Sequence, residues 1–190
     1  ARMLKGEVVR ALELRMRERG VASSRTDDEL VRYHAKMMIV DREELHVYGF
    51  NYTALDLKSR SFGLSCRDRR CVQEGIKLFE ADAAKQDYEP SLDALVVSPE
   101  NAREQLATFI KRAKKQLLIW DPKVSDMQMV RLLQQRAKAG VEVRVLGKVS
   151  RRADALKVEK FAGKRLHVRA MVRDGESAFV GSQSVRPDEL

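Results

Sequence analysis

The chain contains two copies of one short pattern, and this repeat limits the folds that it can adopt. The first copy begins at His34 and the second at His167, which are two of the three histidines in 190 residues. In each copy a basic residue follows at the second position and an aspartate at the seventh, Asp41 and Asp174. Composition alone gives a histidine this spacing in roughly one case in a hundred. The repeat therefore predicts two related halves.

The spacing within each copy suits a β-strand with polar groups on one face. Side chains alternate along a strand, so His34 shares a face with Lys36, and His167 shares one with Arg169. A neighbouring cation lowers the pKa of an imidazole, which favours the neutral, nucleophilic ring, and it also binds phosphate oxygens. Two such strands together predict a site with two imidazoles and two cations. This site needs no metal ion and no other cofactor.

The expected elements alternate between strands and helices, which predicts an α/β sandwich. Its two similar halves would each hold a mostly parallel sheet flanked by helices. In chain order we expect a helix at 4–19, strands at 33–40, 45–48 and 61–66, a helix at 71–85, a strand at 92–97, a helix at 99–115 capped by Ser98, a strand at 117–120, a helix from 125 or 126 to 140, a strand at 141–146, a helix at 151–161, and a hairpin of 166–173 and 178–181 around Asp174-Gly175.

A polar segment at 86–90, which ends in a proline, is the predicted linker. It divides the chain into an N-terminal half at 1–90 and a C-terminal half at 91–190. His167 follows Gly140 by 27 residues (167 − 140), whereas His34 follows Gly20 by only 14 (34 − 20). We therefore expect that the N-terminal half is incomplete, that the C-terminal half is truncated at its end, and that the sequence comes from a longer protein.

Composition excludes several other classes of protein. With 44% hydrophobic and 34% charged residues, the chain is neither disordered nor membrane-spanning. Two cysteines are too few for a disulfide framework. Lysine and arginine exceed aspartate and glutamate by 37 to 28, a net charge of +9. Most of these residues solvate the surface, but a basic surface also favours phosphate-bearing partners, either nucleic acid or anionic lipid.

The repeated pattern resembles the signature of the phospholipase D superfamily, His-x-Lys-x4-Asp-x6-Gly-Ser, which is normally present twice. The first copy runs from His34 to Asp41 and is followed by Gly49-Phe50-Asn51. The second runs from His167 to Asp174 and is followed by Gly181-Ser182-Gln183-Ser184. The segment from Arg60 to Phe62 is similar to the Arg-Ser-Phe stretch that follows the motif in cardiolipin synthases. The resemblance covers most of the chain.

The resemblance implies a phosphodiesterase or phosphatidyltransferase that works through a phosphohistidine. One histidine would attack phosphorus, and the other would protonate the leaving oxygen and then activate water or an alcohol. We assign His34 as the nucleophile and His167 as the general acid, with the exchanged roles as the alternative. Lys36 and Arg169 would bind the equatorial oxygens. The remaining predicted site residues are Asn51, Ser182 and Ser184, which would bind substrate, and Asp41 and Asp174, which would support the site.

The predicted substrate is a phospholipid, and transfer of the cardiolipin synthase type is the more specific version. Such an enzyme would be cytoplasmic and would bind a membrane surface peripherally. The sequence leaves two alternatives open. A metal-independent nuclease with the same fold is favoured by the charge of +9.

A catalytically inactive member that binds lipid or nucleic acid is the second alternative. It is favoured by Arg169, where the family has lysine, and by Ser184, where asparagine is common. The first copy also has seven residues between Asp41 and Gly49 instead of six.

Overall fold

The computed structural model describes residues 2–23, 34–150 and 155–190. The chain forms two compact units, Ala1–Tyr33 and His34–Leu190. The first unit contains the helix α1 (Arg2–Glu18), which is followed by Gly20 in a left-handed conformation with φ of +77°. A helix at 4–19 that ends before a glycine is therefore confirmed. The second unit contains both copies of the repeated motif.

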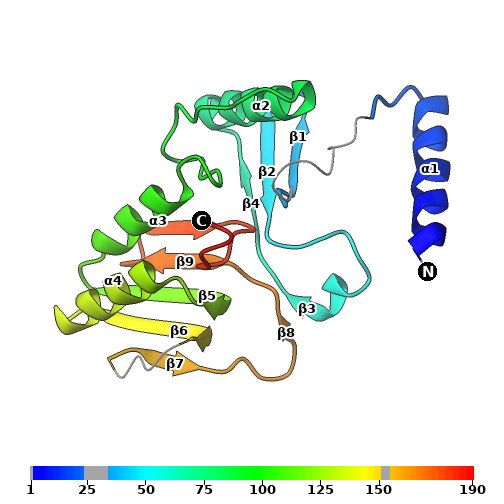
Figure 1. Cartoon of the computed structure of the whole chain (residues 1–190). Helices are drawn as coiled ribbons and strands as arrows, with labels where there is room; N and C mark the ends of the chain where they lie inside the picture. Colours follow the sequence, from blue (N-terminus) through cyan, green and yellow to red (C-terminus); the bar gives the residue numbers. More distant parts are fainter. Residues whose placement is uncertain (1, 24–33, 151–154) are drawn as a thin grey trace. The chain divides into compact units, whose positions relative to one another are not determined.

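The second unit is built of short sheets with helices packed on them (Figure 1). Its elements in chain order are β1 (Met37–Val40), β2 (Glu44–Tyr48), a 3-10 turn (Asp56–Lys58), β3 (Ser59–Arg60), β4 (Gly63–Cys66), α2 (Arg69–Ala84), α3 (Ala102–Lys111), β5 (Gln116–Val124), α4 (Met127–Lys138), β6 (Glu142–Val149), β7 (Lys157–Glu159), β8 (Arg165–Leu166), β9 (Ala170–Arg173) and β10 (Ser177–Val180).

The N-terminal part of this unit is a three-stranded antiparallel sheet in the order β1-β2-β4. Helix α2 begins after Asp68, whose carboxylate accepts two amide hydrogens of the first helical turn. The helix packs on the sheet through Val72 and Ile76, which bury Leu45 of β2. This small hydrophobic cluster fixes the hairpin that carries the first motif copy.

The C-terminal part is a five-stranded sheet in the order β10-β9-β5-β6-β7. Helices α3 and α4 pack on it (Figure 1) and bury a larger hydrophobic cluster, in which Leu106, Ile110, Leu117 and Leu133 are almost fully buried. Strands β5, β6 and β7 are parallel, while β9 and β10 are antiparallel to their neighbours.

The α/β class, with sheets flanked by helices, is thus confirmed, but the prediction that each sheet is mostly parallel was wrong. The first sheet is antiparallel throughout, and the second is mixed. The physical reason is that each motif copy forms a hairpin, and strands joined by a tight turn must run antiparallel.

The two motif hairpins, β1–β2 and β9–β10, have the same register. Every paired residue of the second hairpin lies 133 positions after its counterpart in the first (170 − 37 and 180 − 47). Each hairpin also has the same backbone hydrogen bond just beyond its paired residues: Tyr48 N–H donates to Lys36 O (2.8 Å), and Gly181 N–H donates to Arg169 O (3.1 Å). Tyr48 therefore occupies the position of Gly181, and the extra residue that the sequence placed before Gly49 is not an insertion in the hairpin.

Both hairpin turns also have the same conformation. Asp41 and Arg42 have φ of 52° and 60°, and Asp174 and Gly175 have φ of 55° and 72°. Aspartate and glycine tolerate this left-handed region better than most residues, which explains an aspartate at the start of each turn. The hairpin predicted around Asp174-Gly175 is confirmed.

Two local predictions in the middle of the chain were wrong. The segment at 92–97 is a loop rather than a strand, and the next helix begins after Asn101 rather than after Ser98. Asn101 explains both differences, because its amide oxygen accepts Val97 N–H (2.8 Å) and its amide nitrogen donates to Leu95 O (3.1 Å). These bonds satisfy backbone groups that a strand would pair with a neighbouring strand.

The helix predicted at 151–161 was also wrong for the residues that the structure describes there. Residues 151–154 lie outside the described residues, and Lys157–Glu159 form β7. This short strand extends the sheet by pairing in parallel with β6. An open sheet edge offers backbone partners along its whole length, so tertiary pairing outweighs the local preference for a helix.

The predicted division into 1–90 and 91–190 stays a prediction. The compact unit His34–Leu190 spans this boundary, and β3 pairs with β8 across it, with Arg60 opposite Leu166. In the parts of the chain that the structure describes, no helix has the length and apolar character to cross a membrane.

Candidate functional site

The histidine and the basic residue of each copy lie just before the first hairpin strand, not within it as the strands at 33–40 and 166–173 would require. Strand β1 begins only at Met37, and β9 begins only at Ala170. In the first copy, Lys36 Nζ donates to His34 O (2.5 Å), so the cation lies close to the histidine backbone. In the second copy, His167 N–H donates to Arg60 O (3.0 Å), which continues the β3–β8 pairing.

His167 is buried and is oriented by Asp56, which precedes it by 111 residues. The ring nitrogen Nδ1 of His167 bonds Oδ1 of Asp56. The same carboxylate accepts Thr53 Oγ1 (2.8 Å), Asn51 Nδ2 (3.3 Å) and Arg165 Nη1 (3.3 Å). An ionised carboxylate only accepts hydrogen bonds, so a neutral His167 carries its proton on Nδ1 and leaves the Nε2 lone pair available.

The electrostatic environment favours this state of the pair. Burial lowers the pKa of His167, and Arg169 and Arg165 lower it further, against the opposing effect of Asp56. Burial raises the pKa of Asp56, but the hydrogen bonds that it accepts outweigh burial and bring the pKa to about 2. At neutral pH Asp56 is therefore ionised, and His167 is mainly neutral.

Arg169 lies in a cluster of polar groups at the end of β5 and after β10. Its Nε donates to Ser184 Oγ (3.0 Å), and the carboxylates of Glu189 and Asp121 interact with its charge. Glu189 in turn accepts Ser184 N–H (2.5 Å), and Asp121 accepts Val185 N–H (2.8 Å). Asp121 is 2% exposed, and this burial raises its pKa. The cluster holds Arg169 in place.

Two buried polar atoms near the motif residues have no hydrogen-bond partner among the described residues. They are Nη1 of Arg169 and Oγ of Ser61. Ser61 Oγ lies 3.5 Å from the point that a Cβ on Gly49 would occupy, and Gly181 O lies 3.0 Å from it. The two motif glycines are thus in close contact. A buried donor without a partner is costly unless a ligand or water satisfies it.

The two motif copies meet along a cavity in the second unit. Lys36 of the first copy and Gly181, Ser182 and Gln183 of the second copy all line it. Ser182 is 8% exposed. The sequence-predicted cation of one copy and the predicted small polar residues of the other therefore border the same space.

Two of the predicted substrate-binding residues have partners within the protein. Asn51 donates to Asp56, and Ser184 accepts from Arg169. These residues position the histidine partner and the arginine. Ser182 borders the cavity directly.

The structure does not bring Asp41 and Asp174 to the histidines. Both lie in the turns at the far ends of the hairpins, four strand residues beyond Lys36 and Arg169. The carboxylate of Asp174 instead accepts the N–H groups of Lys114 (3.0 Å), Lys115 (2.7 Å) and Gln116 (2.9 Å). The assignment of these aspartates to the site is corrected accordingly: Asp174 ties the hairpin to the start of β5, and both aspartates form turns.

Sequence reasoning missed Asp56 and Glu189, although an equal spacing from the two motif histidines could have revealed them. Asp56 follows His34 by 22 residues (56 − 34), and Glu189 follows His167 by the same number (189 − 167). Each lies five residues after the predicted substrate-binding residue of its own copy. The repeat therefore extends further than the motif that first revealed it. Asp121, within β5, also lies close enough to Arg169 to interact with its charge.

Among the described residues, no group of three or more histidine, cysteine, aspartate or glutamate side chains is arranged to hold a metal ion.

Comparison with known proteins identifies the fold. No family model and no curated protein matches the chain. Among solved structures, the polyphosphate kinase from Porphyromonas gingivalis superposes on 90% of the chain with a TM-score of 0.71 at 17% sequence identity. That enzyme has a phospholipase D-like fold, so the expected α/β fold of this type is shown. The chain spans 33% of that enzyme's length.

Proposed function

We propose that the chain belongs to a phosphoryl-transfer enzyme that cleaves phosphodiesters through a covalent phosphohistidine. The observation that carries this proposal is the contact between His167 and Asp56, beside the unpaired Nη1 of Arg169. A neutral imidazole with a fixed tautomer supplies a nucleophile, and a neighbouring guanidinium binds the oxygens on which negative charge accumulates. The similarity to a polyphosphate kinase supports phosphoryl transfer as the class of reaction.

The contacts favour the exchanged assignment of the histidines. His167 Nε2 attacks phosphorus and the bond to the leaving oxygen breaks, while His34 gives its proton to that oxygen. His34 then removes a proton from water or an alcohol, whose oxygen attacks phosphorus and releases His167. This order fits His167, because its lowered pKa and its bond to Asp56 keep Nε2 unprotonated. Lys36 and Arg169 bind the non-reacting phosphate oxygens.

We further propose a phospholipid as the substrate, with transfer of the cardiolipin synthase type. The segment that resembles cardiolipin synthases lies against both motif copies: Arg60 O accepts His167 N–H, and Phe62 O accepts Gly49 N–H (both 3.0 Å). Between them, Ser61 holds a buried hydroxyl that has no hydrogen-bond partner among the described residues. These contacts with both motif copies support a role for the segment in the choice of substrate.

An activated substrate separates the two histidine roles. With bis(p-nitrophenyl) phosphate the leaving phenolate needs no proton, so His34→Ala should still release a first equivalent of p-nitrophenol, whereas His167→Ala should release none. Alkaline quenching and peptide mass spectrometry should find the phosphoryl adduct on His167. His46 lies on β2 and bonds Ser65 Oγ (2.7 Å), so His46→Ala is the matched control. An adduct on His34 would restore the original assignment, and turnover by His167→Ala would refute the mechanism.

Parallel reactions with phosphatidylglycerol vesicles and with single-stranded DNA, both in excess EDTA, test the substrate. Cleavage of DNA alone would favour the nuclease. Absence of turnover on every substrate would favour the inactive, binding member. Arg169→Lys then decides whether the arginine is responsible, because a gain in rate would show that the planar guanidinium impairs the site.

A further inference from the structure

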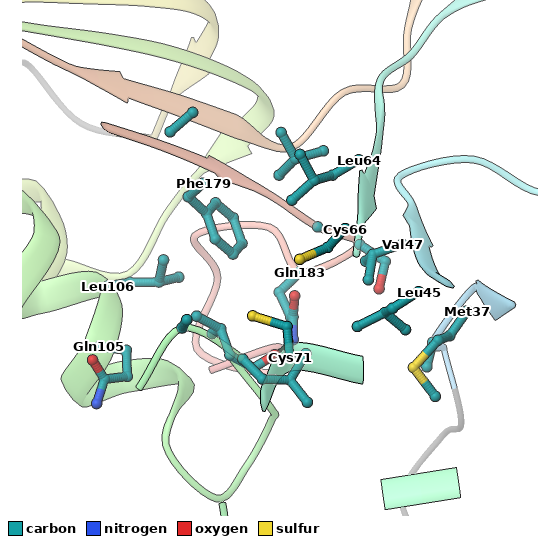
Figure 2. Close-up of a pocket in the computed structure, with 18 of the residues that line it drawn as sticks. Met37, Leu45, Val47, Leu64, Cys66, Cys71, Gln105, Leu106, Phe179 and Gln183 are labelled. Carbon is teal, nitrogen blue, oxygen red and sulfur yellow. Dashed lines mark hydrogen bonds between the residues drawn. The ribbon is translucent and has the colours of Figure 1, made fainter. Parts of the chain in front are cut away.

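The second unit contains a cavity of about 380 Å³ that is lined mainly by apolar side chains. Figure 2 shows Leu106 and Phe179 on one side of it and Leu45 and Val47 on the other. Its volume lies within the roughly 300–1,000 Å³ that small-molecule sites occupy. Walls of this kind favour apolar groups over water, because contact with such groups removes apolar surface from water.

The cavity separates the two hydrophobic clusters of the unit. Leu45 belongs to the small cluster under α2, while Leu106 and Phe179 belong to the large cluster under α3 and α4. Both clusters end at the cavity walls rather than packing on each other. An apolar ligand would join them and would remove further apolar surface from water.

The cavity is polar where it meets the candidate site. Lys36 and Ser182 line it there, and both are residues of the repeated motif. Among the lining residues that the structure describes, Lys36 is the cation and Asp93 is the anion. Asp93 is exposed and accepts a bond from Gln105 (3.1 Å), which places it at a solvent-facing edge. The space is thus apolar along most of its wall and cationic at the motif.

This distribution matches an amphiphile with an anionic head. A nucleic-acid base would need polar partners for its edges, and the aliphatic walls offer few. The exposed residues Leu64, Ala94 and Ala178 also line the cavity, so it opens to solvent through small or aliphatic side chains. A flexible alkyl chain fits such an entrance.

We propose that this cavity binds one acyl chain of a phospholipid whose phosphate lies at Lys36 and Ser182. The inference rests on the proposed function, since it places the phosphate at the proposed reaction site, and it adds how the lipid is selected. The lipid would be selected by the length of its acyl chain, because each methylene removed from water raises the affinity about fourfold.

Binding of alkyl phosphates tests this without requiring turnover. Calorimetry on the wild-type chain would compare inorganic phosphate with butyl, hexyl and octyl phosphate below their micelle concentrations. We expect affinity to rise about fourfold per methylene, which is roughly 250-fold over the four methylenes from butyl to octyl. Equal affinities within threefold across the series would overturn the proposal.

Two variants test whether the gain arises in this cavity. Ala178→Phe and Ala94→Phe each add a ring at an exposed position that lines the cavity, and each should reduce the butyl-to-octyl gain in affinity to below threefold. Ala83→Phe, at an exposed position of α2 outside the cavity, is the matched control and should retain the gain. Urea unfolding of each variant excludes a loss of fold. If both cavity variants keep the butyl-to-octyl gain in affinity, the alkyl chain binds elsewhere and the inference is refuted.

A second readout locates the ligand. Cys66 and Cys71 line the cavity (Figure 2), so bound octyl phosphate should slow their alkylation by N-ethylmaleimide, whereas inorganic phosphate should not. Equal protection by both ligands would contradict the inference. Sedimentation tests whether a second copy of the protein fills the cavity instead of a lipid. A dimer that Ala178→Phe dissociates would show this and would refute the acyl site.

The outcomes separate this inference from the proposed function. Chain-length-dependent binding without turnover would retain the cavity site and refute the enzyme. Turnover through His167 with equal rates for short-chain and long-chain phosphatidylglycerol would retain the enzyme and refute the acyl site.

Discussion

Replacement of Asp56 by asparagine should reverse the tautomer of His167. The amide keeps the shape of the side chain but presents an N–H group as well as an oxygen. If that N–H donates to Nδ1 of His167, the ring must carry its own proton on Nε2, and the nucleophilic lone pair is lost. Loss of the correct tautomer in a comparable carboxylate–histidine pair costs about 10⁴ in kcat. We expect a fall in kcat of roughly 10³ to 10⁴ for Asp56→Asn.

The pH dependence of the reaction provides a readout that a merely structural role would not move. The Asp56 carboxylate raises the pKa of His167 against burial and the nearby arginines, so its removal should lower that pKa further. A nucleophile must be unprotonated, so the acidic limb of the residual rate should move to lower pH. Asp87→Asn is the matched control, at an exposed position with no partner among the described residues. It should leave both the rate and the acidic limb of the pH–rate profile unchanged.

Asp56 also contributes to stability, with a magnitude set by its pKa. The folded-state pKa is about 2 against an ordinary value of 3.8. The difference of 1.8 corresponds to about 2 kcal/mol of unfolding free energy at neutral pH. Because the pKa is depressed on folding, this contribution is present above pH 4 and is lost as pH falls towards 2. Urea unfolding of the wild type should show this loss, and Asp56→Asn should not.

One result would refute the reasoning about the tautomer. If Asp56→Asn folds, retains kcat within threefold of the wild type and leaves the acidic limb in place, then Asp56 does not orient the reacting imidazole.

Three further changes have defined expectations. Glu74 is 3% exposed, and its pKa is about 2 against an ordinary value of 4.5. Glu74→Gln should therefore lower the free energy of unfolding by about 3 kcal/mol at pH 7. Urea titration should find that this difference between the variant and the wild type is lost as pH falls towards 2. Gly147→Ala would place Cβ 1.8 Å from Asp121 O at φ of +147°, and thermal melting should show a loss of about 2 kcal/mol or more, well above that of Gly140→Ala, where nothing lies within 4 Å. His46→Ala should leave turnover within twofold of the wild type; a larger loss would mean that His46 acts in the site.

The repeat is the part of the site that could be predicted. His34, His167 and their neighbouring cations follow from spacing alone, because the two copies form hairpins of the same register. Sequence reasoning extended the strands back to the histidines, whereas β1 and β9 begin three residues later. Strand ends depend on which backbone groups find partners, and local pattern does not contain that information.

The partner of His167 could not be predicted from contacts along the chain. Asp56 and His167 are 111 residues apart, and only the tertiary folding of the second unit brings them together. The same is true of the loop at 92–97, whose apolar sequence is typical of a strand. There, Leu95 packs on the small cluster and Val96 on the large cluster, while Asn101 satisfies the backbone.

The sequence by itself determined the features that depend on neighbouring residues: the duplicated motif, the left-handed turns at Asp41 and Asp174, and the helix that Asp126 caps by accepting two amide hydrogens. These features form because short segments have strong local preferences. The tertiary structure alone decided which carboxylate orients His167, and where the two hydrophobic clusters leave a cavity. Both depend on packing between distant segments, since side-chain contacts and empty volume exist only once those segments have met.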